Sequence, residues 1–234
     1  MLSTDLNANM LAAQFAKRKR VQIPNALEPG SAEAIADVLL GATKWALVFN
    51  RGSQNVTLTQ EEIAGLGKVG MAKLMQECLQ NAQTDFQYIY SSYPIVDAIL
   101  AKRDVGHPLH AVLEQINAAP FRAFVEHVTG VSGLVKADGQ ATLYTRGNFL
   151  TFHNDFDRRD TRRIAYVLGF TKNWKSDWGG LLEFYDDQGN VELGLVPRFN
   201  ALTLFQVPTN HAVTFVPPFV AEGRYSITGW FSIA

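Results

Sequence analysis

From residue 134 onward the chain is a succession of short β-rich runs separated by turn residues, and this pattern constrains the fold more than any other feature. Short runs at regular spacing are typical of a β-sandwich or a jelly roll. We therefore expect the C-terminal part to be an antiparallel jelly roll. The candidate strands are residues 134–144, 149–152, 163–170, 180–185, 191–195, 201–207, 212–216 and 225–233.

The first 133 residues follow a mainly helical pattern. Apolar residues recur at helical spacing in residues 6–17 and 32–40, and Ser31 is placed to cap the second of these helices. The segment 59–62 (Thr-Gln-Glu-Glu) resembles a capping box that starts another helix. Further helices are expected at 71–82 and at 107–128 with a break near Pro120, and short strands at 21–23 and 45–49.

The two parts are expected to form one domain, residues 1–234. No Pro/Ser-rich linker and no internal repeat separates the helical support region, residues 1–133, from the β-rich region, residues 134–234. The predicted fold class is α+β: a double-stranded β-helix (a cupin-like jelly roll) with the N-terminal helices packed on one face. Folds of this plan hold metals inside the mouth of the barrel.

Charge and cysteine usage narrow the function classes. The chain of 234 residues has a formal net charge of -1, so it gives no case for direct nucleic-acid binding, for which a basic domain is expected. The basic cluster 17–20 fits the end of a helix, where cations favour the dipole. Cys78 is the single cysteine, and no run approaches the roughly 18 apolar residues of a membrane span. No secretory pattern is visible, so we expect a cytoplasmic protein without membrane partners.

The triplet His153-Asn154-Asp155 is a candidate metal-binding motif. On an extended segment, residues two apart point to the same side, so His153 and Asp155 could grip one ion. His211 opens another β-rich run, and distant strands of a jelly roll can face one another. Two histidines and one carboxylate form the facial triad of non-haem Fe(II) sites, although the same groups suit zinc. By itself the triplet is more often a surface turn or a hydrogen-bonded pair.

Arg224 leads into an apolar run and needs either an anionic partner or an exit to solvent. Guanidinium matches a carboxylate bidentately. A dicarboxylate such as 2-oxoglutarate could chelate a metal with its 2-oxo acid end and reach Arg224 with the other. The alternative from the residue alone is an arginine that faces solvent or pairs with Glu222.

The stretch from Tyr144 to Phe231 resembles the prolyl-hydroxylase branch of the 2-oxoglutarate- and Fe(II)-dependent dioxygenases, and most closely the group that hydroxylates a proline of a ribosomal protein, with its bacterial relatives. The helical half carries no equally diagnostic string. The matching segments are Tyr144-x-x-Gly147, His153-x-Asp155, residues 162–187, residues 195–207, His211-Ala212-Val213 and residues 223–231.

The resemblance implies a role for each matching residue. His153, Asp155 and His211 would bind Fe(II), and Arg224 would pair with the distal carboxylate of 2-oxoglutarate. Two further residues, Tyr144 and Ser226, would assist in binding this cosubstrate. Dioxygen would be the second cosubstrate, with ascorbate as a possible reductant. The implied reaction hydroxylates a C–H bond, on a prolyl residue of a protein, with release of succinate and carbon dioxide.

Two other functions also fit these residues. The same chemistry could act on a free amino acid or another small molecule, because loops rather than metal ligands read the substrate. A non-catalytic cupin-like binding domain is the other alternative, against which the retained ligands and Arg224 argue. The sequence departs from the family at Gly169, where many relatives carry a cosubstrate-binding tyrosine; Tyr166 is expected to face the opposite side of its strand.

Overall fold

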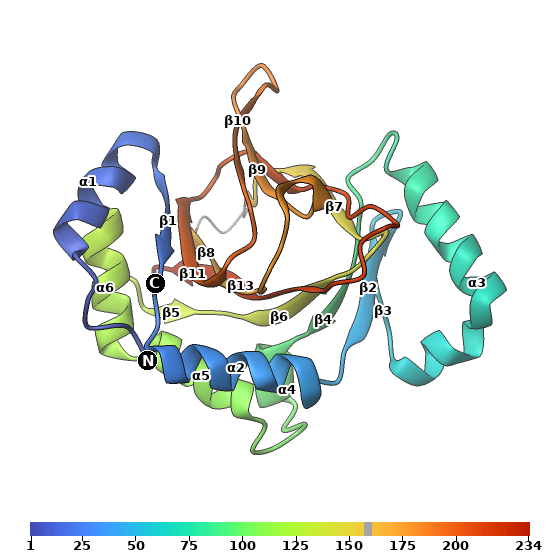
Figure 1. The fold of residues 1–234 in the computed structure, drawn as a ribbon, viewed down its shortest axis with the longest axis horizontal. Helices are drawn as coiled ribbons and strands as arrows, with labels where there is room; N and C mark the ends of the chain where they lie inside the picture. The colour runs from blue at the N-terminus through green and yellow to red at the C-terminus, as the bar shows by residue number, and fades with distance from the viewer. Residues whose placement is uncertain (157–160) are drawn as a thin grey trace.

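The structure is a computed structural model that describes residues 1–156 and 161–234. In these residues thirteen strands form one antiparallel sheet, which curls into a nearly closed barrel (Figure 1). The sheet order is β1-β11-β8-β13-β6-β4-β7-β12-β9-β10, with β2 and β3 continuing from β4, and β5 beside β13. The strands are β1 Arg20–Pro24, β2 Ala46–Arg51, β3 Gln54–Leu58, β4 Tyr88–Tyr93, β5 Lys136–Ala137, β6 Gln140–Tyr144, β7 Phe149–His153, β8 Arg162–Phe170, β9 Leu182–Tyr185, β10 Val191–Leu195, β11 Phe199–Gln206, β12 His211–Val213 and β13 Arg224–Ser232.

Side chains from opposite walls meet inside the barrel. Ala165 of β8 and Phe205 of β11 pack in one buried cluster with Leu182 and Phe184 of β9. Because β9 is far from β8 and β11 in the sheet order, this cluster shows that the sheet folds back on itself. The predicted double-stranded β-helix is confirmed, and each of the eight predicted β-rich runs contains at least one strand.

Five of the helices bury their apolar sides against one outer face of the barrel. The helices α2 (Pro29–Gly41), α4 (Ile95–Leu100) and α5 (Pro108–Asn117) lie under the sheet in Figure 1, and α1 (Ala8–Arg18) and α6 (Ala119–Thr129) stand beside β1. Their side chains form the largest core together with outward-facing residues of β8, β11 and β13. Burial of this apolar area, about 25 cal/mol per Å², is the main force that holds the helical layer on the barrel.

The remaining long helix, α3 (Gln60–Asn81), packs separately on the outside of β2 and β4. Leu74 and Cys78 of this helix meet Phe49 and Ile89 in a second, smaller core. Burial raises the pKa of the Cys78 thiol to about 11, so this cysteine behaves as a small apolar residue and not as a reactive thiolate.

The start of α2 differs from the prediction. α2 begins at Pro29 with Glu28 at its N-cap, so Ser31 lies within the first turn and does not cap the helix. Proline is favoured there because its missing N–H would have no partner in a first turn. The capping box at Thr59 is present, and the non-helical backbone of Gly67 (φ 58°, ψ -174°) divides the segment Gln60–Asn81 into two helical parts, the second of which contains nearly all of the predicted helix 71–82.

The strands β3 and β4 were not predicted. β3 is polar and exposed, and β4 (YIYSSY) carries two serines, so neither segment has the apolar character of a buried strand. β4 nevertheless pairs with β2, β6 and β7 and belongs to the barrel wall. The side chains on the inner face of β4 therefore line part of the barrel interior.

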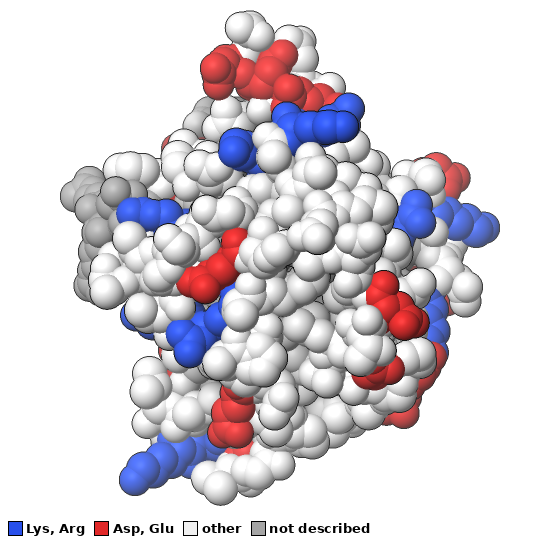
Figure 2. Space-filling model, turned by 90° about the vertical axis from the view of Figure 1, so that its left-hand side faces the viewer, with Lys and Arg blue, Asp and Glu red and all other residues white. Residues whose placement is uncertain are grey.

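Charges of both signs are scattered over the face in Figure 2, and acidic and basic groups meet at the projecting end of the molecule. There the β9–β10 hairpin carries Glu192, which forms an ion pair with Arg20 at the start of β1. The basic cluster 17–20 includes this arginine and lies at the end of α1, as expected. Among the described helices, none is long and apolar enough to cross a membrane.

Candidate metal centre and cosubstrate pocket

The side chains of His153, Asp155 and His211 converge inside the barrel. β12 pairs with β7 in a register that places His211 directly opposite His153. Nε2 of His153 lies 3.2 Å from Oδ1 of Asp155, and Nε2 of His211 lies 3.4 Å from Oδ2. One possible ligand atom from each of the three residues lies within 4.8 Å of the other two. The structure thus brings together all three residues predicted as metal ligands.

Asp155 reaches this position by a different route from the one expected. β7 ends at His153, and Asp155 follows the strand with a left-handed backbone, φ 58°. Strand alternation alone therefore does not explain its direction. Asn154 is exposed, as expected, but its Oδ1 accepts a hydrogen bond of 3.1 Å from the Phe156 N–H. This side chain–backbone bond is typical of an Asx-turn, which explains how the chain turns Asp155 inward.

Backbone carbonyls fix the orientation of both imidazoles. Nδ1 of His153 lies 2.9 Å from the carbonyl of Thr151, and Nδ1 of His211 lies 2.8 Å from that of Thr209. A carbonyl can only accept, so each Nδ1 carries the proton and each Nε2 presents a lone pair to Asp155. This is the tautomer of a metal-binding histidine, whose second nitrogen donates to an outer group.

The electrostatics of the cluster favour a cation. Burial and the neighbouring His153 lower the pKa of His211 to about 4, so this ring is neutral at pH 7. Burial alone would raise the pKa of Asp155, but the two imidazoles and the Trp230 indole outweigh it, and the carboxyl pKa lies below its usual range. An ionised carboxylate thus lies beside the neutral ring of His211, and both are groups that bind a metal cation.

Arg224 lies in the same cavity and is buried, with 5% of its surface exposed. Its Nε has no hydrogen-bond partner, and within the described residues its guanidinium forms no ion pair. Cζ lies 4.9 Å from the ring centroid of Tyr144, and burial lowers the pKa of the guanidinium. The structure therefore contradicts both the solvent-facing arginine and the pairing with Glu222. A buried cation without a partner is costly unless an anion binds beside it.

Tyr144 and Ser226 lie beside Arg224, as the prediction of a cosubstrate pocket requires. Register pairs Arg224 of β13 with Tyr144 of β6, and Ser226 with Thr142. The hydroxyls of Ser226 and Thr142 are 2.7 Å apart. A cavity of about 360 Å³ contains the metal cluster, Arg224, Tyr144 and Ser226 in its lining.

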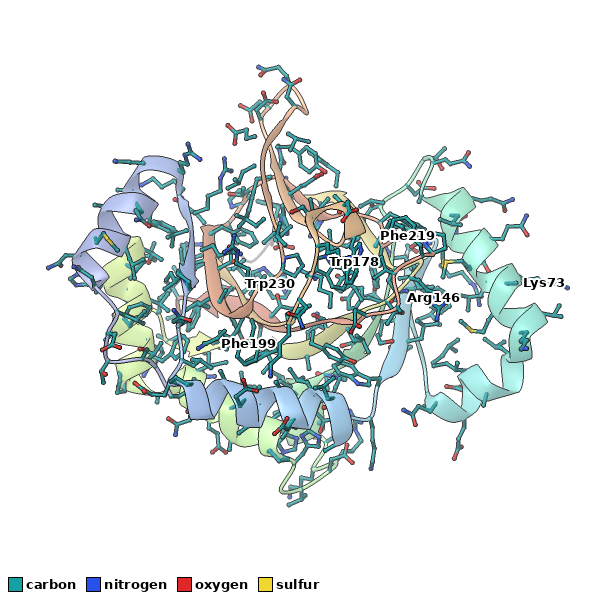
Figure 3. The ribbon with its side chains drawn as sticks, viewed as in Figure 1. Lys73, Arg146, Trp178, Phe199, Phe219 and Trp230 are labelled. Atoms are coloured by element: carbon teal, nitrogen blue, oxygen red, sulfur yellow. The ribbon has the colours of Figure 1, made fainter. Side chains whose placement is uncertain are left out.

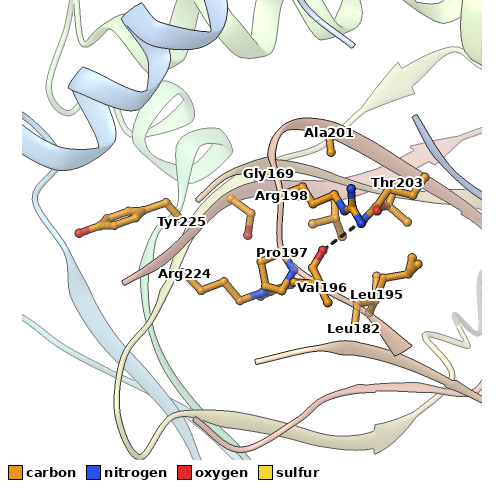
Figure 4. A pocket seen from close by; sticks show the side chains of 13 residues that line it. Gly169, Leu182, Leu195, Val196, Pro197, Arg198, Ala201, Thr203, Arg224 and Tyr225 are labelled. Atoms are coloured by element: carbon orange, nitrogen blue, oxygen red, sulfur yellow. Dashed lines mark hydrogen bonds between the residues drawn. The ribbon is translucent and has the colours of Figure 1, made fainter. Parts of the chain in front are cut away.

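The structure explains the glycine at position 169. A Cβ on Gly169 would lie 2.4 Å from the carbonyl oxygen of Arg198, so the backbone of the 197–198 loop occupies the space of a side chain. Figure 4 shows this loop beside Arg224 and Gly169 at a small hollow of about 20 Å³. Tyr166 faces the outer core, as expected, and its hydroxyl donates to the carbonyl of Asp138 at 2.8 Å. No replacement for the missing tyrosine comes from β8.

Sequence reasoning missed several residues that line the cavity. Tyr88 and Tyr90 of β4, with Phe86 just before it, continue the aromatic wall from Tyr144. Their period-2 spacing was a readable strand signal. Trp230 lies inside the barrel (Figure 3) and donates from Nε1 to Asp155 Oδ2 at 2.9 Å.

The arginines that surround the His153-x-Asp155 motif in the sequence lie in different places. Arg162 lines the cavity, with Cζ 3.8 Å from the centroid of a Trp230 ring, whereas Arg146 is exposed on another part of the surface. Two of the arginines, Arg158 and Arg159, lie outside the described residues, together with Asp157 and Asp160.

Comparison with known proteins agrees with this geometry. Residues 139–232 match the family described as the 2OG-Fe(II) oxygenase superfamily. This region of the chain is thus similar to that superfamily. The match implies Fe(II), 2-oxoglutarate and dioxygen as cofactors, as predicted from the sequence, and the donor set and the buried Arg224 fit an iron ion and a dianion.

A curated relative and two solved structures are similar to this chain. The prolyl 3-hydroxylase OGFOD1 of Mus musculus is 31% identical over 133 residues, which are 53% of this chain and 24% of that protein; the chain thus spans about a quarter of it. A Pseudomonas putida prolyl-4-hydroxylase aligns with a TM-score of 0.60 at 19% identity, over 96% of this chain and 100% of that one. A Trichoplax adhaerens prolyl hydroxylase, solved with a hypoxia inducible factor peptide, aligns with a TM-score of 0.61 at 18% identity, over 96% and 88%. At these identities the solved structures show the shared fold.

Proposed function

We propose that this protein is a 2-oxoglutarate- and Fe(II)-dependent dioxygenase that hydroxylates a prolyl residue of a protein substrate. The observation that carries the proposal is the buried, unpaired Arg224 in the same cavity as the His153, Asp155 and His211 cluster. The triad alone would suit several divalent metals. A cation without a counter-ion deep in that cavity adds a second requirement, an anionic ligand, which 2-oxoglutarate meets with its distal carboxylate.

Each residue then has a defined task. His153, Asp155 and His211 hold Fe(II) on one side and leave its other positions open. Arg224 binds the distal carboxylate, and Tyr144 and Ser226 border the same ligand. When bound, iron and cosubstrate supply the oxidising power that inserts one oxygen atom of dioxygen into a C–H bond and releases succinate and carbon dioxide. The chain itself orients these groups and excludes water; residues 1–234 act as one domain in this proposal.

The relatives support the prolyl substrate. The mouse relative is a prolyl 3-hydroxylase, and the Trichoplax adhaerens protein carries a peptide in its structure. The sequence motifs resemble most closely the group that hydroxylates a ribosomal protein. We therefore include a protein that presents an accessible proline as the partner.

Two measurements test the proposal. Calorimetry should show that Mn(II)-loaded protein binds 2-oxoglutarate, and that His153→Ala abolishes metal binding, whereas the surface variant His127→Ala retains both. Succinate release with Fe(II) should rise when proline-containing peptides are added. Stimulation by free amino acids only would assign the chemistry to a small molecule. Failure of the metal-loaded protein to bind 2-oxoglutarate would instead leave a non-catalytic cupin-like binding domain.

A further inference from the structure

Phe86 is a half-exposed phenylalanine at the mouth of the cavity, next to a histidine of the proposed metal cluster. Its ring centroid lies 5.3 Å from that of His153, and 46% of its surface is exposed. Tyr88 continues the same wall, 5.8 Å from Phe86 between centroids, and its hydroxyl donates to Oδ1 of Asn55 at 2.9 Å. A single exposed phenylalanine is ordinary on a protein surface. Two further observations distinguish this one.

The first observation is that buried amides fix the backbone around Phe86. Nδ2 of Asn50 donates to the Phe86 carbonyl at 3.3 Å, and the fully buried Gln87 side chain donates to the carbonyl of Asn50 at 2.9 Å. On the other side, the Gln87 N–H donates to Oγ1 of Thr151 at 2.9 Å, and the Thr151 N–H donates to the Gln87 carbonyl at 2.9 Å. The segment is thus anchored to both β2 and β7. A rigid position of this kind lowers the entropy lost on binding a ligand.

The second observation is the order of the aromatic rings along the wall. Centroid distances are 5.4 Å from Tyr88 to Tyr90 and 4.9 Å from Tyr90 to Tyr144, and Tyr144 in turn lies under the guanidinium of Arg224. The anion-binding end of the cavity is therefore several rings away from Phe86. At the Phe86 end, Tyr88 and Asn55 are uncharged, so among the described residues this wall offers no charged group to the ammonium or carboxylate of a free amino acid.

We propose that Phe86 and Tyr88 form the specificity wall of the site and hold the pyrrolidine ring of a prolyl residue within a peptide, beside His153. This inference rests on the proposed function and names two residues that select its substrate. Aromatic-lined surfaces recognise proline because its ring packs flat on their faces and brings little conformational entropy to lose. A neutral wall also favours a proline within a chain, which has no charged backbone groups, over the free amino acid.

The test uses N-acetyl-L-prolinamide as the probe and protein loaded with Zn(II) and 2-oxoglutarate, which is diamagnetic and does not turn over. Saturation-transfer NMR should show contact with the pyrrolidine protons in the unaltered protein, and at least a fivefold loss of signal in Phe86→Ala. Tyr88→Phe keeps the ring and should keep most of the signal. Phe219→Ala is the matched control: Phe219 is 69% exposed and lies away from Trp230, toward the right-hand edge of the barrel in Figure 3.

Calorimetry with 2-oxoglutarate separates this inference from the proposed function. All three variants should bind 2-oxoglutarate within twofold of the unaltered protein. The inference is overturned if Phe86→Ala retains the full signal, or if N-acetyl-L-alaninamide gives an equal one. It is also overturned if Phe86→Ala weakens Zn(II) binding instead, because Phe86 then shields the metal. Absence of 2-oxoglutarate binding in the unaltered protein would contradict the proposed function itself.

Discussion

The indole Nε1 of Trp230 donates a hydrogen bond of 2.9 Å to Oδ2 of Asp155, and so connects β13 to the carboxylate of the proposed metal cluster. Asp155 follows the end of β7 with a left-handed backbone and has no strand pairing to hold it. The indole bond therefore adds to the turn at Asn154 in fixing the direction of this side chain. The guanidinium of Arg162 lies over a Trp230 ring and limits the movement of the indole.

We expect Trp230→Phe to weaken Mn(II) binding by about 10- to 100-fold, the usual effect of removing a partner of a metal ligand. The ring remains, but the hydrogen bond to Asp155 is lost. Electron paramagnetic resonance titration of Mn(II) measures the affinity. Trp178→Phe changes a tryptophan that does not line the cavity and should leave the affinity unaltered. Equal affinities in the two variants would mean that Asp155 is oriented by the metal alone.

Arg224 is the residue at which function and stability are most clearly opposed. Within the described residues its buried guanidinium has no counter-ion and its Nε no hydrogen-bond partner, so the protein without cosubstrate carries a charge that these residues do not compensate. We expect Arg224→Met to abolish 2-oxoglutarate binding while the free energy of unfolding of the cosubstrate-free protein rises by about 1–3 kcal/mol. Urea unfolding and calorimetry measure the two effects.

Arg224→Lys is the control for this experiment. It keeps a positive charge but loses the bidentate geometry, so it should weaken 2-oxoglutarate binding without raising stability. A loss of stability in Arg224→Met, together with intact 2-oxoglutarate binding, would show that Arg224 serves the fold and not the ligand. The Mn(II) affinity should be the same in both variants, because neither change touches the metal cluster.

The barrel was predictable from the sequence because its strands are short apolar runs with clear turns between them. His153 and His211 were identifiable as candidates because each lies at the edge of such a run, and the β7–β12 register brings them opposite each other. Asp155 was chosen by strand alternation, although its backbone has left the strand. The local turn at Asn154, and not strand alternation, directs Asp155 toward the two histidines. The residue types of the triplet do not indicate this turn.

β4 is harder to predict than the other barrel strands, because its two serines make it polar and only the period-2 spacing of Tyr88 and Tyr90 indicates a strand. Its pairing partners lie forty or more residues away in β2, about fifty away in β6 and sixty or more away in β7. Only the closed barrel turns Tyr88 and Tyr90 toward the cavity. The need for a glycine at position 169 could not be predicted from the sequence either, because it depends on the approach of the Arg198 carbonyl from a distant loop.

The pKa of His211 predicts how the metal-free protein responds to pH. Burial and His153 lower this pKa from 6.5 to about 4 in the folded protein. Between pH 6.5 and 4 the unfolded chain therefore binds a proton that the folded chain does not, and the stability present above pH 6.5 is lost as the pH falls. The loss from this residue should approach about 3 kcal/mol near pH 4.

Urea unfolding in the presence of a chelator, repeated across this pH range, measures the effect. His211→Gln should have a flatter dependence on pH than the unaltered protein, because the titrating group is gone. His127→Gln, which replaces an exposed histidine outside the site, should keep the original slope. Identical slopes in all three proteins would show that His211 is not held in its neutral form by the fold.

Packing against the 197–198 loop leaves no room for a side chain at Gly169. A Cβ at this position would lie 2.4 Å from the Arg198 carbonyl, so Gly169→Ala should push the 197–198 loop outward and lower the free energy of unfolding by about 1–3 kcal/mol. Gly194→Ala is the control within another strand, because a Cβ there would meet its nearest atom at an ordinary 3.6 Å. Since the loop borders Arg224, Gly169→Ala should also weaken 2-oxoglutarate binding in calorimetry, and Gly194→Ala should not. Equal stability of the two variants would mean that the loop yields freely, and the glycine would then need another explanation.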